Sequence, residues 1–526
     1  MHHSRAHGGY RRGTKVQSNC AIELKNIRKT FGQIVANDEI NLQINRGEIL
    51  CLLGENGSGK TTLMNMLSGI YQPDSGEIFK DGEQVAIRSP RDAYSLGIGM
   101  IHQHYHLVDV FTAAQNIILG LENEKMDLGA VNDKVKEICD RYGFKVDPKK
   151  KIYDMSVSQK QTIEIVKVLY RGAEILILDE PTAVLTPQET EKLFDVLRNM
   201  KADNKAIILI THKLAEVLAV SDKVAILRKG RYIGTVETKD ATAQSLTDMM
   251  VGHAVTLNID RPVYEDVHDK LVIEHLTVLD NEGIKKLDDV SFTAKTGEIL
   301  GVAGIAGSGQ KELLESITGL YPIKEGSIKF INENSDDIEL VGKTPMQIRQ
   351  VGVGMGFVPE DRLGMGLVGS MGMTGNMMLR SWRNGKSIFF NKKNPEALAN
   401  KVWQDLEVVT PSTEFPVRRM SGGNIQKVLV GREIASSPPV LLTAYAVRGL
   451  DINTSYTIYS LLTEQKMHGA AVMYVGEELD VLLQLCDRIL VLCGGKVSGI
   501  VDARTATKDQ IGLLMTSVGG NEGGQE

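Results

Sequence analysis

The stretch GEILCLLGENGSGKTTLMNML, residues 47–67, decides the fold of this chain. It combines an apolar run typical of a buried strand, Ile49–Leu53, with a glycine-rich loop, Gly54–Thr61, and the start of a helix. The loop fits the pattern G-x-x-x-x-G-K-[ST], in which glycines let backbone N–H groups curl around phosphate oxygens at a helix N-terminus. We expect Lys60 to reach the phosphates and the Thr61 hydroxyl to coordinate Mg²⁺. For the loop taken alone, the alternative is an accidental glycine turn.

Two later strands end in residues that suit the same chemistry. The apolar run Ile175–Leu178 is followed by Asp179 and Glu180, and Ala206–Ile210 is followed by a threonine and His212. Parallel strands would bring these ends to the edge of the sheet that carries the glycine loop. Asp179 could then hold Mg²⁺, and Glu180 could orient and deprotonate a water molecule. The alternatives are an acidic turn after the first strand and a structural histidine after the second.

The chain also repeats itself. The stretch GEILGVAGIAGSGQKELLESI, residues 297–317, answers the opening stretch about 250 residues later, and each is followed by a serine-rich or glycine-rich segment, MSVSQ from Met155 and MSGGN from Met420. Apolar runs alternate with amphipathic helices in both halves, which predicts an α/β fold. One such helix carries Val131, Val135, Ile138 and Tyr142 on one stripe and ends at Gly143. The predicted divisions are a disordered tail 1–20, a first domain 21–250, a linker 251–270, a second domain 271–518 and a disordered tail 519–526.

Composition limits the class of protein. Of the 526 residues, 42% are hydrophobic and 24% are charged, and the net charge of −6 gives no basic field that would attract nucleic acid. The five cysteines show no metal-like or paired spacing, which suits a reducing compartment. No apolar run is long enough for a membrane helix, and the polar N-terminus does not look like a secretion signal. We therefore expect any link to a membrane to pass through a partner.

In this order the motifs resemble those of the ATP-binding-cassette (ABC) family across nearly the whole chain. Gln103, in MIHQHYHLV, resembles the family's glutamine loop, and His212 resembles its switch histidine. Phe31 falls where the family stacks an aromatic ring on adenine, although a core phenylalanine is the alternative. The resemblance implies two tandem ABC-type ATPase domains, each with an α/β core and a helical subdomain. It also implies a catalytic set of Glu180, His212, Lys60 and Gln103, and Mg²⁺ ligands Thr61, Gln103 and Asp179.

The same resemblance implies how ATP is held. In the ABC family two halves meet head to tail, and each nucleotide lies between the phosphate loop of one half and the signature segment of the other. The ATP-binding residues would be Phe31, Gly54, Glu55, Asn56, Gly57, Ser58, Gly59, Lys60, Thr61 and Thr62, with Ser421, Gly422, Gly423 and Asp451 from the other half.

The second half departs from the family pattern. The positions of the loop lysine, loop hydroxyl, acidic pair, glutamine and histidine hold Gln310, Lys311, Ala444 with Tyr445, Glu360 and Glu477. Losing the lysine removes charged hydrogen bonds of about 1.5–3 kcal/mol. Losing the general base costs at least about 10²-fold in rate. The second loop is therefore predicted to hydrolyse ATP poorly or not at all.

The defects gather on one side of the implied arrangement. The intact loop would face the complete Ser421–Gly422–Gly423 and Asp451, whereas the damaged loop would face Ser156–Val157–Ser158 and Thr186. A serine at position 158 adds bulk where the backbone should approach a phosphate closely. We interpret this segregation as one competent composite ATP site.

A tandem with one good and one degraded site resembles the ATPases of bacterial sugar and nucleoside importers. The segments HQHYHLV and FVPEDRLGMGLV favour the nucleoside branch over the ribose and galactose branch, which is the alternative. The resemblance implies two transmembrane permease subunits, an extracellular solute-binding lipoprotein and a peripheral place on the cytoplasmic face of the membrane. A soluble tandem ABC ATPase acting on ribosomes or DNA is a further alternative, which the short linker and the net charge of −6 disfavour.

Overall fold

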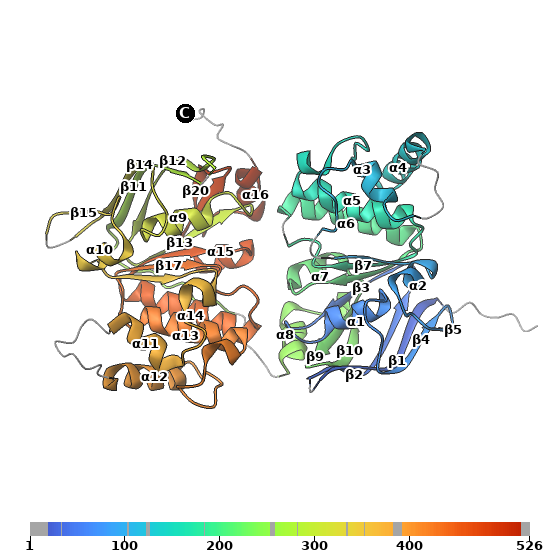
Figure 1. The fold of residues 1–526 in the computed structure, drawn as a ribbon, viewed down its shortest axis with the longest axis horizontal. Coiled ribbons are helices and arrows are strands. Elements are labelled where there is room, and N and C mark those ends of the chain that lie inside the picture. The colour runs from blue at the N-terminus through green and yellow to red at the C-terminus, as the bar shows by residue number, and fades with distance from the viewer. Residues whose placement is uncertain are drawn as a thin grey trace, which may run out of the picture. The chain divides into compact units, whose positions relative to one another are not determined.

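The computed structural model describes residues 19–32, 34–102, 105–121, 127–183, 185–252, 258–280, 282–332, 335–351, 353–381 and 392–516. These residues form two compact units (Figure 1). The first unit contains the described residues up to Ala183 together with Leu193–Gly252, and the second contains a short segment ending at Lys192 and the described residues from 258 onward.

The first half of the chain contains strands β1 to β10. Their bounds are β1 (Cys20–Phe31), β2 (Ile34–Asn45), β3 (Glu48–Leu53), β4 (Ser75–Lys80), β5 (Glu83–Val85), β6 (Ile98–Ile101), β7 (Ile175–Asp179), β8 (Ala206–Ile210), β9 (Lys223–Arg228) and β10 (Arg231–Glu237). Its helices are α1 (Lys60–Leu67), α2 (Pro90–Ser95), α3 (Ala113–Ile118), α4 (Leu128–Tyr142), η1 (Ile152–Asp154), α5 (Val157–Tyr170), α6 (Pro187–Ala202), α7 (Leu214–Val220), η2 (Thr238–Asp240) and α8 (Ala243–Val251).

The second half contains strands β11 to β20. Their bounds are β11 (Asp269–Leu279), β12 (Lys285–Lys295), β13 (Glu298–Gly304), β14 (Glu325–Phe330), β15 (Ile338–Glu339), β16 (Met355–Val358), β17 (Val440–Ala444), β18 (Ala471–Val475), β19 (Arg488–Cys493) and β20 (Lys496–Asp502). Its helices are α9 (Gln310–Ile317), α10 (Pro345–Gln350), η3 (Arg362–Gly366), α11 (Met373–Ser381), α12 (Lys393–Asp405), η4 (Val417–Arg419), α13 (Gly422–Ile434), α14 (Ile452–Met467), α15 (Leu479–Leu485) and α16 (Lys508–Thr516).

Each unit is built on the same pair of sheets. In the first unit a six-stranded sheet has the order β10-β9-β3-β8-β7-β6, and in the second the order is β20-β19-β13-β18-β17-β16. The strands pair in parallel except at the β9–β10 and β19–β20 edges. A four-stranded antiparallel sheet accompanies each one, with the orders β2-β1-β4-β5 and β12-β11-β14-β15. The repeated sequence therefore folds twice into one topology.

The strand that leads to each glycine loop lies inside its sheet. β3 has β8 and β9 as neighbours, and every residue from Ile49 to Leu53 is buried, which explains its uninterrupted apolar sequence. In register with β3, Ile210 of β8 lies beside Leu52 and also beside Asp179 of β7. The carboxyl ends of β3, β7 and β8 consequently meet at one edge of the sheet, which is where parallel sheets bind their ligands.

Helices form a separate layer in each unit. In the first unit α3, α4 and α5 share their own core, which includes Val131, Val135 and Ile163, and they lie at the opposite end from the antiparallel sheet (Figure 1). The predicted helix stripe is confirmed, because α4 buries Val131, Val135 and Tyr142 and packs the partly buried Ile138 against the same core. The helix is capped by Gly143 in a left-handed conformation (φ 84°).

The predicted fold class, two tandem domains with an α/β core and a helical part, is confirmed by this architecture. β1 begins at Cys20 and β11 at Asp269, just inside the predicted tail 1–20 and linker 251–270. The tail 519–526 lies outside the described residues, and the exact domain bounds stay predictions. Among the helices of the described ranges, none is both long and apolar enough to cross a membrane.

Candidate functional site

The glycine loop of the first unit joins β3 to α1. It is closed against the sheet, because a Cβ atom on Gly54 would lie 2.3 Å from the carbonyl oxygen of Leu227 and 2.5 Å from Oγ of Ser58. Gly59 precedes α1 with a φ of 98°, a conformation that side chains rarely adopt. Both glycines are therefore required by the local backbone, and the loop leads directly into the N-terminus of α1, where a phosphate cradle is expected.

Lys60 lies within this loop. Its side chain is buried, and Nζ donates hydrogen bonds to the carbonyl oxygens of Gly54, at 2.7 Å, and Glu55, at 3.0 Å. Burial lowers the pKa of Lys60, while the carboxylates of Glu180 and Asp179 act in the opposite direction. The geometry thus places a lysine ammonium group beside the phosphate-binding backbone.

Thr61 and Asp179 come together beside the loop. The Thr61 hydroxyl donates to Oδ2 of Asp179 at 3.2 Å, and burial raises the pKa of that carboxyl group. Mg²⁺ prefers oxygen ligands and is held by one or two protein groups plus substrate phosphates. A hydroxyl and a carboxylate next to a phosphate loop therefore fit this ion.

Glu180 and His212 form a hydrogen-bonded pair. Oε1 of Glu180 lies 2.9 Å from Nδ1 of His212, and this contact is the main cause of the lowered pKa of Glu180. Glu180 has a φ of 46°, and its backbone N–H donates to the carbonyl oxygen of Ile210 at 2.9 Å. The sharp turn after β7 carries the Glu180 side chain toward the end of β8. A carboxylate held in its charged form beside a histidine can act as a general base.

Phe31 ends β1 and is 42% exposed, so the alternative of a core phenylalanine is wrong. Its ring meets Tyr71 edge to face, with centroids 5.2 Å apart, and the ammonium group of Lys29 lies 5.6 Å from the ring centroid. Asp74 ties down this end of the strand by accepting hydrogen bonds from the Thr30 backbone, at 2.6 Å, and the Thr30 hydroxyl, at 2.7 Å. The exposed ring is available for stacking on a base, the role predicted for Phe31.

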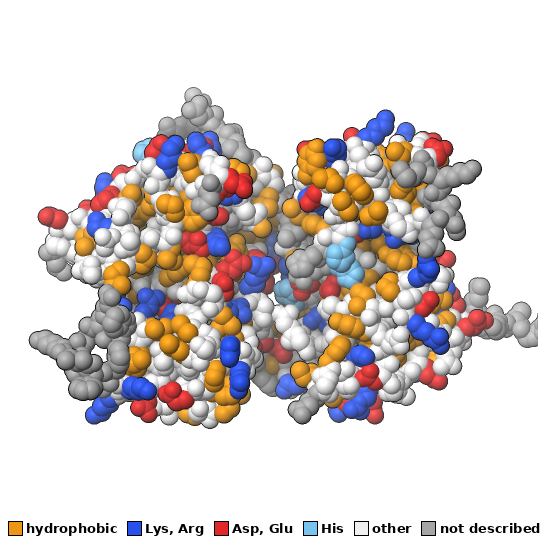
Figure 2. Space-filling model, in the orientation of Figure 1, with side chains coloured by type: hydrophobic (Ala, Val, Ile, Leu, Met, Phe, Trp, Pro, Cys, Tyr) orange, Lys and Arg blue, Asp and Glu red, His pale blue; other side chains and the backbone are white. Residues whose placement is uncertain are grey.

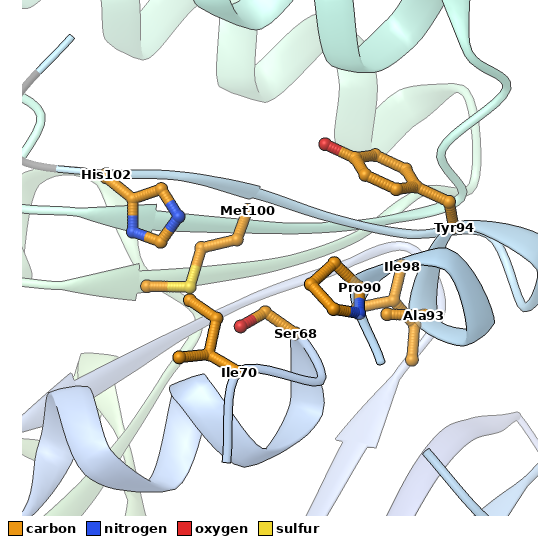
Figure 3. Close-up of a pocket in the computed structure, with 8 residues that line it drawn as sticks. All are labelled: Ser68, Ile70, Pro90, Ala93, Tyr94, Ile98, Met100 and His102. Atoms are coloured by element: carbon orange, nitrogen blue, oxygen red, sulfur yellow. The ribbon is translucent and has the colours of Figure 1, made fainter. Parts of the chain in front are cut away.

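The predicted glutamine, Gln103, lies outside the described residues, and the chain is described up to His102. That residue borders a cavity of about 70 Å³ whose lining is shown in Figure 3: Ser68, Ile70, Pro90, Ala93, Tyr94, Ile98, Met100 and His102. His102 and Ile70 lie at one end of it and Tyr94 and Ala93 at the other. Ligand pockets usually measure roughly 300–1,000 Å³, so this cavity is too small for a nucleotide. Burial, together with His106 at a ring distance of 5.0 Å, lowers the pKa of His102.

The second unit keeps the backbone of the site and changes its side chains. Gly309 precedes α9 with a φ of 99°, and Tyr445 follows β17 with a φ of 50° and an N–H that donates to Val475 at 3.0 Å. Gln310 is buried and donates to the carbonyl oxygen of Ile305 at 3.2 Å, as Lys60 does to Glu55. The exposed Lys311 lies 3.8 Å from Glu315. The loop and the strand-end turn persist without the ammonium group, the hydroxyl or the acidic pair.

An arginine that the sequence analysis did not single out joins the remaining positions of the second unit. Arg448 Nη1 lies 2.6 Å from Glu360, and Arg448 Nε lies 3.2 Å from Glu477. These two glutamates stand where the resemblance places the glutamine and the switch histidine. The only sequence signal for Arg448 is the pair of glutamates at these two positions, because carboxylates that lie close together favour a nearby cation.

The two signature segments begin helices. Ser421 precedes α13, and its Oγ accepts from the Asn424 backbone at 3.4 Å and from the Asn424 side chain at 2.8 Å. A Cβ atom on Gly423 would lie 3.3 Å from Oδ2 of Asp451, so the predicted residues Gly423 and Asp451 are neighbours. In the first unit Ser156 precedes α5 and is bonded to Gln159 in a capping box.

A phosphate loop with a buried lysine, a hydroxyl beside a strand-end aspartate and a carboxylate paired with a histidine define an ATP-hydrolysing P-loop protein. The sequence profile of the family described as ABC transporter matches residues 37–183 and 287–443, which lie in both halves. The chain belongs to this family and is an ABC ATPase.

Curated relatives match nearly the whole chain. The nucleoside import ATP-binding protein NupA of Lactococcus lactis is 42% identical over 95% of this chain and 98% of its own length. The guanosine import ATP-binding protein NupO of Bacillus subtilis is 42% identical over 96% of this chain and 99% of its own length. A ribose import ATP-binding protein, RbsA 1 of Rubrobacter xylanophilus, is 36% identical over 94% of this chain and 98% of its own length.

Proposed function

We propose that this chain is the ATP-hydrolysing subunit of an ABC importer for nucleosides, with a single competent ATP site. The observation that carries the chemical part of the proposal is the hydrogen bond of 2.9 Å between Glu180 and His212 at the edge of the phosphate loop, in the first unit. The part concerning the solute is supported by the identity of 42% to two relatives named for nucleoside and guanosine import.

In the proposed chemistry Glu180 accepts a proton from the water that attacks the γ-phosphate of ATP. His212 holds the carboxylate in place through Nδ1, and Lys60 contributes positive charge where the phosphates lie. Thr61, Asp179 and Gln103 would hold Mg²⁺, which neutralises charge on the phosphate oxygens when it is bound. Phe31 would stack on the adenine ring, with Tyr71 behind it.

We propose that the second phosphate loop does not hydrolyse ATP. Gln310 offers a neutral amide where Lys60 offers a cation, and Tyr445 occupies the turn that holds the general base in the first unit. Burial, with Glu477 and Glu360 nearby, raises the pKa of Tyr445 to about 12, so its neutral phenol cannot replace the carboxylate as a base near neutral pH.

The proposal takes from the family resemblance that the two halves share their ATP sites. Ser421, Gly422, Gly423 and Asp451 would then complete the site of the first phosphate loop. Ser156–Val157–Ser158 and Thr186 would meet the second loop, so that all defects belong to one site.

The proposed partners are two transmembrane permease subunits and an extracellular solute-binding lipoprotein, with this chain held peripherally on the cytoplasmic face of the membrane. The support is that its relatives are named as import ATP-binding proteins. No nucleic-acid partner is proposed, because the net charge is −6 and acidic and basic side chains are interspersed on the face of each unit that Figure 2 shows.

Ribose import is the second candidate, and the relative named for ribose import favours it at 36% identity. Both candidates can be tested by reconstituting the chain in proteoliposomes with the proposed permease subunits and solute-binding lipoprotein. Uptake of labelled purine nucleosides, pyrimidine nucleosides and ribose is then measured with and without ATP. A matched pair of variants consists of Glu180→Gln, which should abolish uptake, and Glu83→Gln at an exposed position of β5, which should not.

The expected result is ATP-dependent accumulation of nucleosides that an excess of unlabelled ribose inhibits only weakly. Accumulation of ribose without nucleosides would contradict nucleoside import and support ribose import. Hydrolysis of ATP with no uptake of either solute would contradict both.

A further inference from the structure

Arg448 lies in the turn between β17 and α14 of the second unit. Its guanidinium group pairs with Glu360, at 2.6 Å, and with Glu477, at 3.2 Å, and it lies 5.9 Å from the centroid of the Tyr445 ring. The two glutamates follow β16 and β18, which flank β17 on its two sides. One side chain therefore ties together the loops that follow three adjacent strands.

The two carboxylates occupy positions that serve catalysis in the first half. Glu360 aligns with Gln103 and Glu477 with His212, while the position of Arg448 itself holds Ala183 in the first half. In the first unit His212 pairs with the base, Glu180, at 2.9 Å. In the second unit an ion pair between Arg448 and Glu477 lies at the equivalent strand ends, in place of the pair of base and histidine.

The backbone of Arg448 extends the cluster to the signature segment. Its carbonyl oxygen accepts a hydrogen bond from Nη2 of Arg362, the first residue of η3. Nη1 of Arg362 lies 3.2 Å from the point where a Cβ atom on Gly422 would stand, so the guanidinium group lies against the signature backbone. Three residues beyond Arg448, Asp451 precedes α14 and lies beside Gly423. The Arg448 turn is thus linked to the signature at two points, through Arg362 beside Gly422 and through Asp451 beside Gly423.

We propose that Arg448 is a positioning residue, which holds the signature segment Ser421–Gly423 in place by bracing Glu360, Glu477 and Arg362 around one turn. This inference rests on the proposed function, in which that segment completes the ATP site of the first phosphate loop. The second half then keeps a structural role in ATP hydrolysis. Glu360 and Glu477, at the positions that hold Gln103 and His212 in the first half, stabilise the signature segment that the second half contributes to the intact site. The first half has no counterpart, since the equivalent position there holds an uncharged alanine.

The test measures the ATPase rate of the reconstituted importer with Arg448→Ala. Arg448 is 56% exposed, so the variant should fold, and the thermal midpoint checks this. Exposed ion pairs are weak, and losing two of them should lower kcat about two- to thirtyfold. The KM for ATP should change less than about twofold, because the first phosphate loop is untouched. Arg231→Ala, which breaks an exposed ion pair with Asp38 at 3.0 Å in the first unit, is the matched control and should leave kcat unchanged.

A second set of variants separates bracing from a general structural role. In the double variant Glu360→Gln with Glu477→Gln the brace has no anions, so adding Arg448→Ala should cause no further loss of kcat. Arg448→Lys keeps the charge and should restore part of the rate. Raising the salt concentration to roughly 1 M should shrink the gap between wild type and Arg448→Ala, because salt screens exposed pairs.

The inference is overturned if Arg448→Ala has the wild-type kcat, or if it costs as much in the double-glutamine background as in the wild type. Both results are read from ATP hydrolysis alone. A complex that hydrolyses ATP but imports no nucleoside would refute the proposed function and leave this test intact.

Discussion

Exchanging Lys60 and Gln310 for alanine, one at a time, tests whether a single phosphate loop supports the reaction. The two side chains start equivalent helices, α1 and α9, and both are buried. Lys60 brings a charge and two hydrogen bonds, at 2.7 and 3.0 Å, whereas the amide of Gln310 donates one neutral bond at 3.2 Å. The chemistry lost in the two exchanges is therefore unequal.

The magnitudes follow from the charge that Lys60 carries. In the proposed function Nζ of Lys60 donates to phosphate oxygens when ATP is bound, and a hydrogen bond that involves a charged group contributes about 1.5–3 kcal/mol, so two such bonds amount to roughly 3–6 kcal/mol. Lys60→Ala should consequently lower kcat/KM by about 10²- to 10⁴-fold. Gln310→Ala loses a neutral bond of about 0.5–1.5 kcal/mol, and this loss falls on folding stability rather than on the reaction. Its ATPase rate should stay within about threefold of wild type.

The assay is steady-state phosphate release by the importer reconstituted with its permease, at several ATP concentrations. Thermal midpoints of both variants show whether either loss reflects unfolding. Equal losses in the two variants, or a tenfold loss in Gln310→Ala with an unchanged thermal midpoint, would refute the idea of one working site.

Three further predictions concern the first unit. Glu180→Gln should bind ATP as the wild type does while phosphate release falls at least about 10²-fold, and a rate within about threefold of wild type would remove Glu180 from the role of base. Gln103→Ala should reduce the stimulation of ATPase activity by permease and loaded lipoprotein much more than it weakens nucleotide binding, and equal stimulation in both forms would place the coupling elsewhere. The ion pair with Lys29 and the hydrogen bonds from Thr30 lower the pKa of Asp74 to about 2. The ionised Asp74 therefore stabilises the fold at every pH above its unfolded pKa of about 4, and this stabilisation is lost as the pH falls toward 2. Asp74→Asn should therefore melt slightly below wild type at pH 7, and the two thermal midpoints should converge between about pH 4 and pH 2; a gap that is constant with pH would contradict this.

That the first glycine loop, Asp179, Glu180 and His212 lie together could be predicted from the sequence, because these residues follow continuous local patterns. The apolar run of β3, the glycine loop and the start of α1 occupy one unbroken stretch. β7 ends at Asp179, and His212 lies two residues beyond the end of β8. Parallel pairing then brings these ends together without further information from distant residues.

Arg448 could not be predicted in the same way. It has no periodic pattern around it, and its partner Glu360 is 88 residues away in the sequence. Two exposed ion pairs depend on side-chain placement that neither propensity nor spacing determines. The strand order of the antiparallel sheet of β1, β2, β4 and β5 could not be predicted either, because β1 and β4 become neighbours only through a connection that contains the whole phosphate loop.

The turn after β7 recurs after β17 with almost the same backbone, a φ of 46° at Glu180 and 50° at Tyr445. A left-handed residue other than glycine costs about 1–3 kcal/mol, and such strain is often taken to mark an active site. Here a tyrosine with no part in the proposed reaction bears it too, held by an N–H bond of 3.0 Å to the neighbouring strand. The left-handed turn therefore belongs to the strand-end architecture that both units share, so backbone distortion alone would mark the turn of the second unit as readily as the turn of the proposed competent site.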